Sequence, residues 1–186
     1  MINNVRVWMR GGRWKIRTGA PVSFVERVRG AAATNQIEIP SDIERELAVI
    51  ELLTTQIRES DREMAKLAKA NPVARRLMTL PGVGPVTALR FLAALDDVTR
   101  FPAAHSVGSY LGLTPGEHSS AETKQRTGIT KAGPKALRSV LIQAAWSAIR
   151  TRPADPMVQW AERIAKRRGR HVGVVALARK MSGILF

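Results

Sequence analysis

The stretch that organises the chain opens with Leu80-Pro81-Gly82-Val83-Gly84-Pro85-Val86-Thr87-Ala88. Apolar helical patterns precede and follow this Gly-Val-Gly turn. Glycine permits positive φ and close approach to a phosphate, and the helix that follows presents unpaired N–H groups and a positive dipole end. The pattern therefore predicts a helix-hairpin-helix turn that contacts a nucleic-acid backbone through Gly82, Val83 and Gly84. The alternative is a tight helix–helix turn in which the glycines serve packing only.

The same stretch continues outward to Arg138. It passes through Tyr110-Leu111-Gly112-Leu113-Thr114-Pro115, Ser119-Ser120 and Thr127-Gly128-Ile129-Thr130-Lys131-Ala132-Gly133. Its richness in Gly, Ser and Thr predicts a loop or a short hairpin over residues 113–133. A serine nucleophile needs a proton acceptor and a group that stabilises developing charge, and the neighbours that could supply them are His118, Lys124 and Arg126. The alternative is an ordinary pair of loop serines.

Residues 41–70 contain no Gly or Pro and open with a capping box, Ser41 followed by Glu44. Apolar residues recur at alternating steps of three and four, at Ile43, Leu47, Ile50, Ile57, Met64 and Leu67. This spacing predicts a long amphipathic, coiled-coil-like helix of roughly 45 Å. Its apolar seam is expected to pack on the same chain or on a second copy, so homo-oligomerisation through residues 41–70 is one expectation.

Further helical patterns cover residues 73–79, 85–95, 134–150, 156–168 and 173–185, and no strand-type alternation is sustained. The predicted fold class is all-α, with a long coiled-coil-like helix followed by a compact helical domain. Three parts are predicted: a basic N-terminal remnant or connector over 1–40, the long helix over 41–71, and the helical domain over 72–186.

The net charge is +15, and residues 115–186 alone carry 14 basic and 4 acidic side chains. Such a concentration of positive charge favours a polyanion, most simply nucleic acid, over a basic protein without a specific partner. Nine cationic residues are the candidate contacts, at Lys124, Arg126, Lys131, Lys135, Arg138, Lys166, Arg167, Arg168 and Arg170.

Cysteine is absent from the chain, which excludes a disulfide scaffold and a thiolate metal site. A reducing cytoplasm is the predicted location, and no membrane partner is expected because no apolar run of about 18 residues occurs. Asp96-Asp97 is predicted to be a loop pair rather than a metal site, and His105 and His171 to be structural or surface residues. No metal ligands are therefore predicted.

Taken in order, these motifs are similar to a known family. The run Leu77 to Pro85, the run Tyr110 to Pro115, the serine pair and the run Gly128 to Gly133 resemble the C-terminal part of the "IS one-ten" insertion-sequence transposases. The resemblance covers about residues 40–186, including a closing helix from Val174 to Leu185.

The resemblance implies a DNA recombinase. Such transposases have an N-terminal RuvC-like nuclease domain with four metal-binding acidic residues, a coiled-coil helix, and a C-terminal domain with a nucleophilic serine. They recombine DNA as oligomers through a covalent serine–DNA intermediate, and some members are guided by a structured RNA. The family's serine falls on the Ser119-Ser120 pair. We favour Ser120, because a glycine usually follows the serine, although Ala121 stands there in this chain.

The chain departs from the family in length and in lacking a RuvC-like segment before these motifs. The resemblance therefore implies a truncated copy with no cofactor of its own, whose divalent metal (Mg²⁺) belongs to the missing domain. The expected function is DNA binding in DNA transposition, with a serine nucleophile for strand exchange that is inactive alone. The alternative is a non-catalytic nucleic-acid-binding module, or a regulator that pairs with a full-length transposase.

Overall fold

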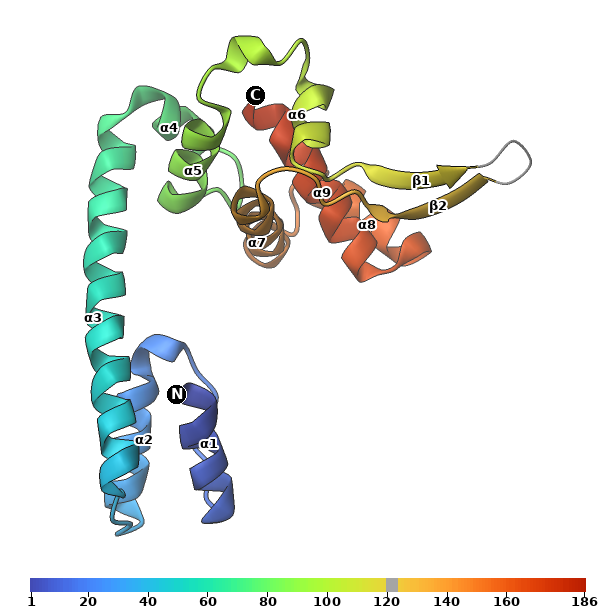
Figure 1. The fold of residues 1–186 in the computed structure, drawn as a ribbon. Coiled ribbons are helices and arrows are strands. Elements are labelled where there is room, and N and C mark those ends of the chain that lie inside the picture. Colours follow the sequence, from blue (N-terminus) through green and yellow to red (C-terminus); the bar gives the residue numbers. More distant parts are fainter. Residues whose placement is uncertain (120–123) are drawn as a thin grey trace. The chain divides into compact units, whose positions relative to one another are not determined.

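The computed structural model describes residues 1–119 and 124–186, with side chains described outside 118–126. Within these residues the chain is mainly helical and has one two-stranded sheet (Figure 1), so the predicted fold class is confirmed. The contacts divide the chain into two compact units, residues 1–63 and residues 64–186. None of the described helices combines the length and the apolar character that crossing a membrane requires.

The first unit is a small helical assembly. It contains α1 (Ile2–Gly11), the 3-10 turn η1 (Pro21–Ser23), α2 (Phe24–Thr34) and the first part of α3 (Ser41–Ala70). Side chains spaced by helical turns meet in its core, where Val5, Phe24, Val28 and Leu47 are each at most 1% exposed. Residues 1–40 thus form two helices with their own buried side chains.

Arg29 links α2 to α3 on the surface of the first unit. Its guanidinium donates to Glu44 Oε1 at 2.6 Å and to Glu51 Oε2 at 3.0 Å. The hydrogen bond to Glu44 is the largest cause that raises the pKa of Arg29. Both carboxylates are about half exposed, so this bridge orients the helices more than it stabilises them.

The long helix α3 has the bounds that the sequence predicted, Ser41–Ala70. Its predicted seam, however, is divided between two environments. Ile43, Leu47 and Ile50 are buried in the core of the first unit, whereas Ile57 is 60% exposed and Leu67 is 59% exposed. The N-terminal half of the seam therefore packs within the chain, and pairing of α3 with a second copy stays a prediction.

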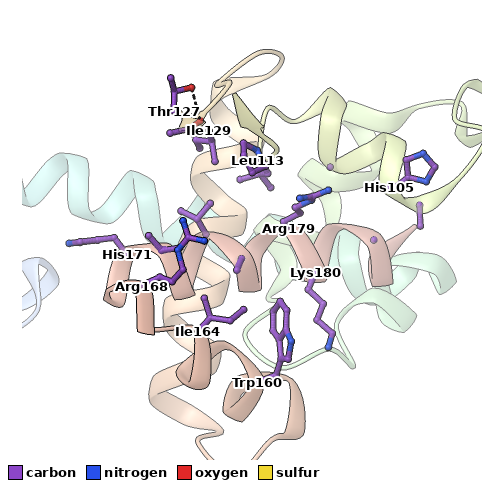
Figure 2. Close-up of a pocket in the computed structure, with 18 residues that line it drawn as sticks. His105, Leu113, Thr127, Ile129, Trp160, Ile164, Arg168, His171, Arg179 and Lys180 are labelled. Atoms are coloured by element: carbon purple, nitrogen blue, oxygen red, sulfur yellow. Dashed lines mark hydrogen bonds between the residues drawn. The ribbon is translucent and has the colours of Figure 1, made fainter. Parts of the chain in front are cut away.

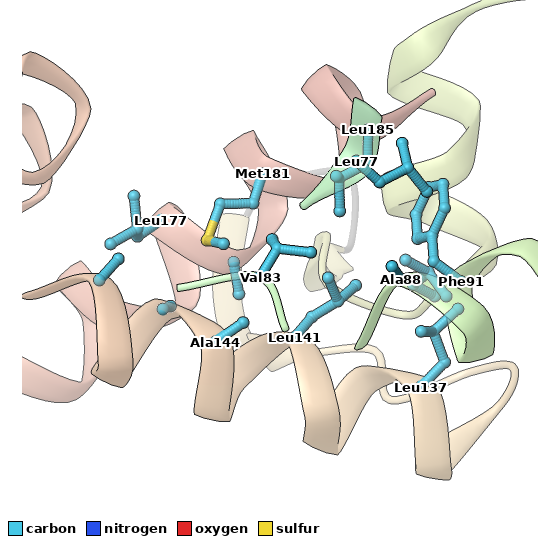
Figure 3. Close-up of a cluster of buried hydrophobic side chains, with 14 of the residues drawn as sticks. Leu77, Val83, Ala88, Phe91, Leu137, Leu141, Ala144, Leu177, Met181 and Leu185 are labelled. Carbon is cyan, nitrogen blue, oxygen red and sulfur yellow. The ribbon is translucent and has the colours of Figure 1, made fainter. Parts of the chain in front are cut away.

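The second unit is built around α7 (Lys135–Thr151) and α9 (Arg170–Leu185), which contact each other closely. Phe91, Leu141, Leu177 and Met181 lie in its apolar core (Figure 3). Its other elements are α4 (Pro72–Leu77), α5 (Pro85–Leu95), the 3-10 turn η2 (Val98–Arg100), α6 (Ala104–Tyr110) and α8 (Pro156–Arg168). The helices predicted around 73–79, 85–95, 134–150, 156–168 and 173–185 are all present.

The segment predicted as a loop or short hairpin contains an antiparallel hairpin. Strand β1 (Pro115–Ser119) pairs with β2 (Lys124–Ile129), with a register irregularity between Pro115 and Glu117. Figure 1 shows the hairpin leaving the helical part of the second unit as an arm. The arm joins the helices at one end only, so its position depends on the contacts at its base.

Candidate nucleic-acid interface

Two motif segments that are distant in sequence meet where the hairpin leaves the helices. We call residues 111–114 together with residues 129–133 the hairpin base. The N–H of Thr130 donates to the carbonyl of Thr114 at 2.9 Å. Gly112 has a φ of +64°, and a Cβ there would lie 2.3 Å from the backbone of the opposite segment. Only glycine fits this approach, so the residue type in the motif has a packing reason.

Residues 131 and 133 of the hairpin base also lie close to the backbone of the opposite segment. The N–H of Lys131 donates to the carbonyl of Gly112 at 3.1 Å. Gly133 has a φ of +74°, and a Cβ added to it would lie 1.8 Å from the carbonyl oxygen of Tyr110. Lys131 itself has a φ of +57° and an exposed side chain. Its cation is therefore held at the surface by a fixed backbone.

Arg138 fastens the hairpin base to α7. Its Nη1 donates to the carbonyl oxygen of Leu111 and to that of Ala132, both at 2.9 Å. The side chain is 8% exposed, so its charge is satisfied by carbonyl groups inside the unit. Arg138 therefore has a structural role in the hairpin base, and its buried charge is not exposed to a nucleic acid.

Ser119, one of the two predicted nucleophiles, lies at the far end of the described part of the hairpin. Ser119 is the last residue of β1 and pairs in register with Lys124, while Arg126 pairs with Glu117. Ser120 lies outside the described residues. The structure thus places the backbones of Ser119, Lys124 and Arg126 on one hairpin, and the role of the serines stays a prediction.

The Gly-Val-Gly turn packs against α7. A Cβ on Gly82, whose φ is +82°, would lie 2.1 Å from the carbonyl oxygen of Ala144. Val83 is buried in the apolar core, whereas Gly84 caps α5 and has open space around its Cα. Of the three predicted contact residues, Gly82 and Val83 therefore serve packing, whereas Gly84 is half-buried and has room beside its Cα.

A polar pocket of about 470 Å³ lies between this turn and the end of α7. Its walls carry the hydroxyls of Thr79, Ser147 and Thr151 and the cation of Arg152. Thr151 donates to the carbonyl of Ser147 at 2.8 Å, so its hydroxyl is already engaged. A phosphate contact at this turn stays a prediction.

The end of α8 is the densest described group of exposed cations. Lys166, Arg167 and Arg168 fill its last turn, and Arg170 follows after Gly169. Lys131 and Lys135 are exposed as well. The Arg170 guanidinium lies 4.9 Å from the ring centre of Trp146, so that tryptophan supports a cation as well as the core.

A groove of about 790 Å³ lies along α9, and sequence reasoning missed it. Figure 2 shows Leu113 and Ile129 on one side of the helix and Trp160 and Ile164 on the other. Four elements distant in sequence form it: α6, the hairpin base, α8 and α9. The sequence signal that could have revealed it is that Val172, Val175 and Ala176 lie outside the buried face of α9. From the sequence this segment was predicted only to be an apolar helix.

The sequence also singled out Asp97, His105 and His171, and these three residues do not form one cluster. Asp97 Oδ1 accepts hydrogen bonds from the hydroxyl and the N–H of Thr99, and these two bonds lower the pKa of Asp97. His105 and His171 both line the groove. Within the described residues, no three His, Asp or Glu side chains lie close enough together to hold a metal ion.

Comparison with known proteins gives one consistent result. The model described as "Transposase IS116/IS110/IS902 family" matches residues 74–158. The chain is 30% identical to the transposase for insertion sequence element IS1111A of Coxiella burnetii, over 100% of this chain and 52% of that protein. It is 33% identical to the putative transposase y4pF/y4sB of Sinorhizobium fredii, over 71% of this chain and 35% of that protein. The chain thus spans about half the length of the first relative, and less of the second.

Proposed function

Because the chain belongs to the IS116/IS110/IS902 family of transposases, we propose that it acts in DNA transposition by holding nucleic acid and presenting a serine nucleophile. The observation that carries the proposal is the hairpin base. Two backbone hydrogen bonds join the two segments of the hairpin base, and the buried Arg138 fixes the arm that bears Ser119 to a helical core with exposed cations. Attack on a phosphodiester requires a hydroxyl and cations that stabilise the developing negative charge, and the proposal assigns these roles to the serine pair and to the cations of this unit.

The nucleic-acid partner is proposed to be DNA, with a structured guide RNA as a further partner. The proposed contacts are the exposed cations Lys131, Lys135, Lys166, Arg167, Arg168 and Arg170, together with Lys124 and Arg126 of the hairpin. Helix N-termini and glycine turns add backbone donors for phosphate, as at Gly84.

The proposed chemistry is phosphoryl transfer to serine, on Ser120 or on Ser119. The serine oxygen forms a bond to phosphorus, and the bond from phosphorus to a deoxyribose oxygen breaks. The leaving oxygen takes up a proton, and the serine loses one. The described residues do not fit the Mg²⁺ that the family resemblance implies, so no step is assigned to a metal in this chain. Strand transfer is therefore proposed to require a RuvC-like domain.

Nucleic-acid binding is expected to depend on salt through the end of α8. Replacement of Lys166, Arg167, Arg168 and Arg170 with glutamine should reduce the slope of log K against log salt by about 0.9 for each phosphate that is no longer neutralised, or roughly 3.6 in total. Fluorescence anisotropy with element DNA over a salt series measures the slope.

The matched control removes four exposed cations from α3, by Arg45→Gln, Arg62→Gln, Lys66→Gln and Lys69→Gln. It changes the net charge equally and should leave the slope nearly unchanged. Equal slopes for both quadruple variants would show that the chain binds DNA only through its net charge. A wild-type protein whose affinity did not vary with salt would contradict the proposed nucleic-acid function as a whole.

A second copy of the chain is the proposed partner of α3. Within the first unit, Val49, Leu52, Leu53 and Ile57 form a stripe on this helix and are 43–60% exposed. Leu53→Glu with Ile57→Glu should weaken self-association at least a hundred-fold, because burial of each side chain contributes about 1.5–3 kcal/mol. Sedimentation equilibrium measures the change.

The control for that variant is Ala48→Glu with Thr55→Glu, which places two carboxylates on an exposed part of α3 outside the stripe. It should associate as the wild type does. A wild-type chain that sediments as a monomer at all concentrations would exclude pairing through α3.

A further inference from the structure

Helix α9 has a buried apolar face and an outward face that is apolar along its first half. Leu177 and Met181 are fully buried in the core of the second unit. Val172, Val175 and Ala176 follow each other at steps of three and one on the other face and line the groove, and Val172 is 45% exposed. The same outward face carries Arg179 and Lys180 further along the helix, and both are exposed. The outward face of α9 is therefore built to receive something that is partly apolar.

The walls of the groove continue this apolar surface. Leu113 and Ile129 from the hairpin base line one side, and Trp160 and Ile164 from α8 line the other (Figure 2). The floor runs along about three turns of α9, or roughly 16 Å at about 1.5 Å per residue. The groove is thus long enough for a short extended segment.

The rim of the groove is cationic. Arg168, Arg179 and Lys180 line it together with His171, and none of the described lining residues is acidic. In the described part of the chain, none of these four side chains forms an ion pair. The Arg179 side chain lies against Gly108 of α6, where an added Cβ would be 3.4 Å from its Cγ and 3.6 Å from its Nε.

An apolar floor with a cationic rim fits an occupant that carries flat apolar faces and regularly spaced negative charges. We propose that the groove binds single-stranded nucleic acid, with unpaired bases over the outward face of α9 and phosphates at Arg168 and Arg179. A duplex keeps its bases stacked and paired, so it could use the rim but not the floor. This inference rests on the proposed function and adds the strand state of the ligand.

The position of the groove agrees with this ligand. The hairpin base forms one of its walls, so a strand held there passes beside the arm that carries the serine pair. Exchange of DNA strands requires a strand to be separated from its complement near the reacting phosphate. A groove that accepts only the separated strand would keep it from pairing again.

The test compares a labelled oligothymidylate with a duplex of equal length, by anisotropy at one salt concentration. Val172→Ser with Val175→Ser makes the floor more polar without changing charge. Affinity for the single strand should fall about ten-fold or more, because two apolar side chains no longer pack on the bases, while duplex affinity should change less than about two-fold. The control is Ile184→Ser, which is 53% exposed on α9 but does not line the groove.

A second measurement uses the wild-type chain, so it does not depend on whether a variant folds. A strand containing 4-thiothymidine, crosslinked to the wild-type chain by ultraviolet light, should attach to Trp160 or to peptides of α9. The inference would be overturned if crosslinks were found only elsewhere, or if Val172→Ser with Val175→Ser left single-strand affinity unchanged. Salt-dependent binding of duplex DNA would remain in either case. The inference would also be overturned if Val172→Ser with Val175→Ser abolished the binding of an acidic amphipathic peptide and left single-strand affinity unchanged. Absence of salt-dependent binding to both nucleic-acid forms would instead contradict the proposed function.

Discussion

Gly133→Ala is expected to destabilise the second unit by about 2–5 kcal/mol. A Cβ at this position would lie 1.8 Å from the carbonyl oxygen of Tyr110, and the φ of +74° is costly for any residue with a side chain. The clash is with backbone, so no rotamer change can relieve it. Thermal unfolding followed by circular dichroism should show a midpoint lowered by roughly 10–20 °C.

Alanine variants of two other glycines distinguish backbone strain from the steric clash as causes of the destabilisation. Gly169 has a φ of +95° but open space around it, so Gly169→Ala measures backbone strain alone, at about 1–2 kcal/mol. Gly128 has neither a positive φ nor a near neighbour, so Gly128→Ala should change stability little. If Gly133→Ala were no worse than Gly169→Ala, the hairpin base would not approach Tyr110 as closely as described.

Replacement of the nucleophilic serine should abolish the covalent intermediate completely. The assay combines the chain with element DNA, a separately expressed RuvC-like domain and Mg²⁺, and detects a protein–DNA adduct that resists denaturation. Ser120→Ala, or Ser119→Ala if that residue is the nucleophile, should reduce the adduct to background because no oxygen remains to bond to phosphorus. The other single variant should retain most of the activity.

Ser109→Ala is the matched control, since Ser109 is an exposed serine of α6 in the same unit. It should form adduct as the wild type does. An adduct that persists when both Ser119 and Ser120 are alanine would exclude the pair as nucleophile. No wild-type adduct under any condition, together with salt-dependent DNA binding, would favour the alternative of a non-catalytic module that regulates a full-length transposase.

The helices could be predicted from the sequence because their signals are local. The bounds of α3 follow from an unbroken run between Pro40 and Pro72, and α5 and α8 begin at Pro85 and Pro156 as a first-turn proline indicates. The sequence shows glycine at positions 112 and 133 of the motifs, but it does not show why glycine is needed there. Their reason is a contact between segments about twenty residues apart, and spacing alone does not reveal such a contact.

The candidate site was less predictable, for two physical reasons. Arg138 reads as a surface cation, because the sequence cannot show that two carbonyl groups satisfy it inside the unit. The groove along α9 needs four elements to assemble before it exists. The domain division predicted at residues 40 and 71 stays a prediction, because α3 runs without a break from the first unit into the second.

Two kinds of contact hold the hairpin base: backbone hydrogen bonds between its segments, and the side chain of Arg138 from α7. Thr114 and Thr130 tie the strands to each other, while Arg138 holds both segments of the hairpin base to α7. If the arm holds DNA as proposed, a pull on the arm by a DNA end would be shared between the backbone hydrogen bonds of the hairpin base and α7. The hairpin base would then resist rotation of the arm relative to α7.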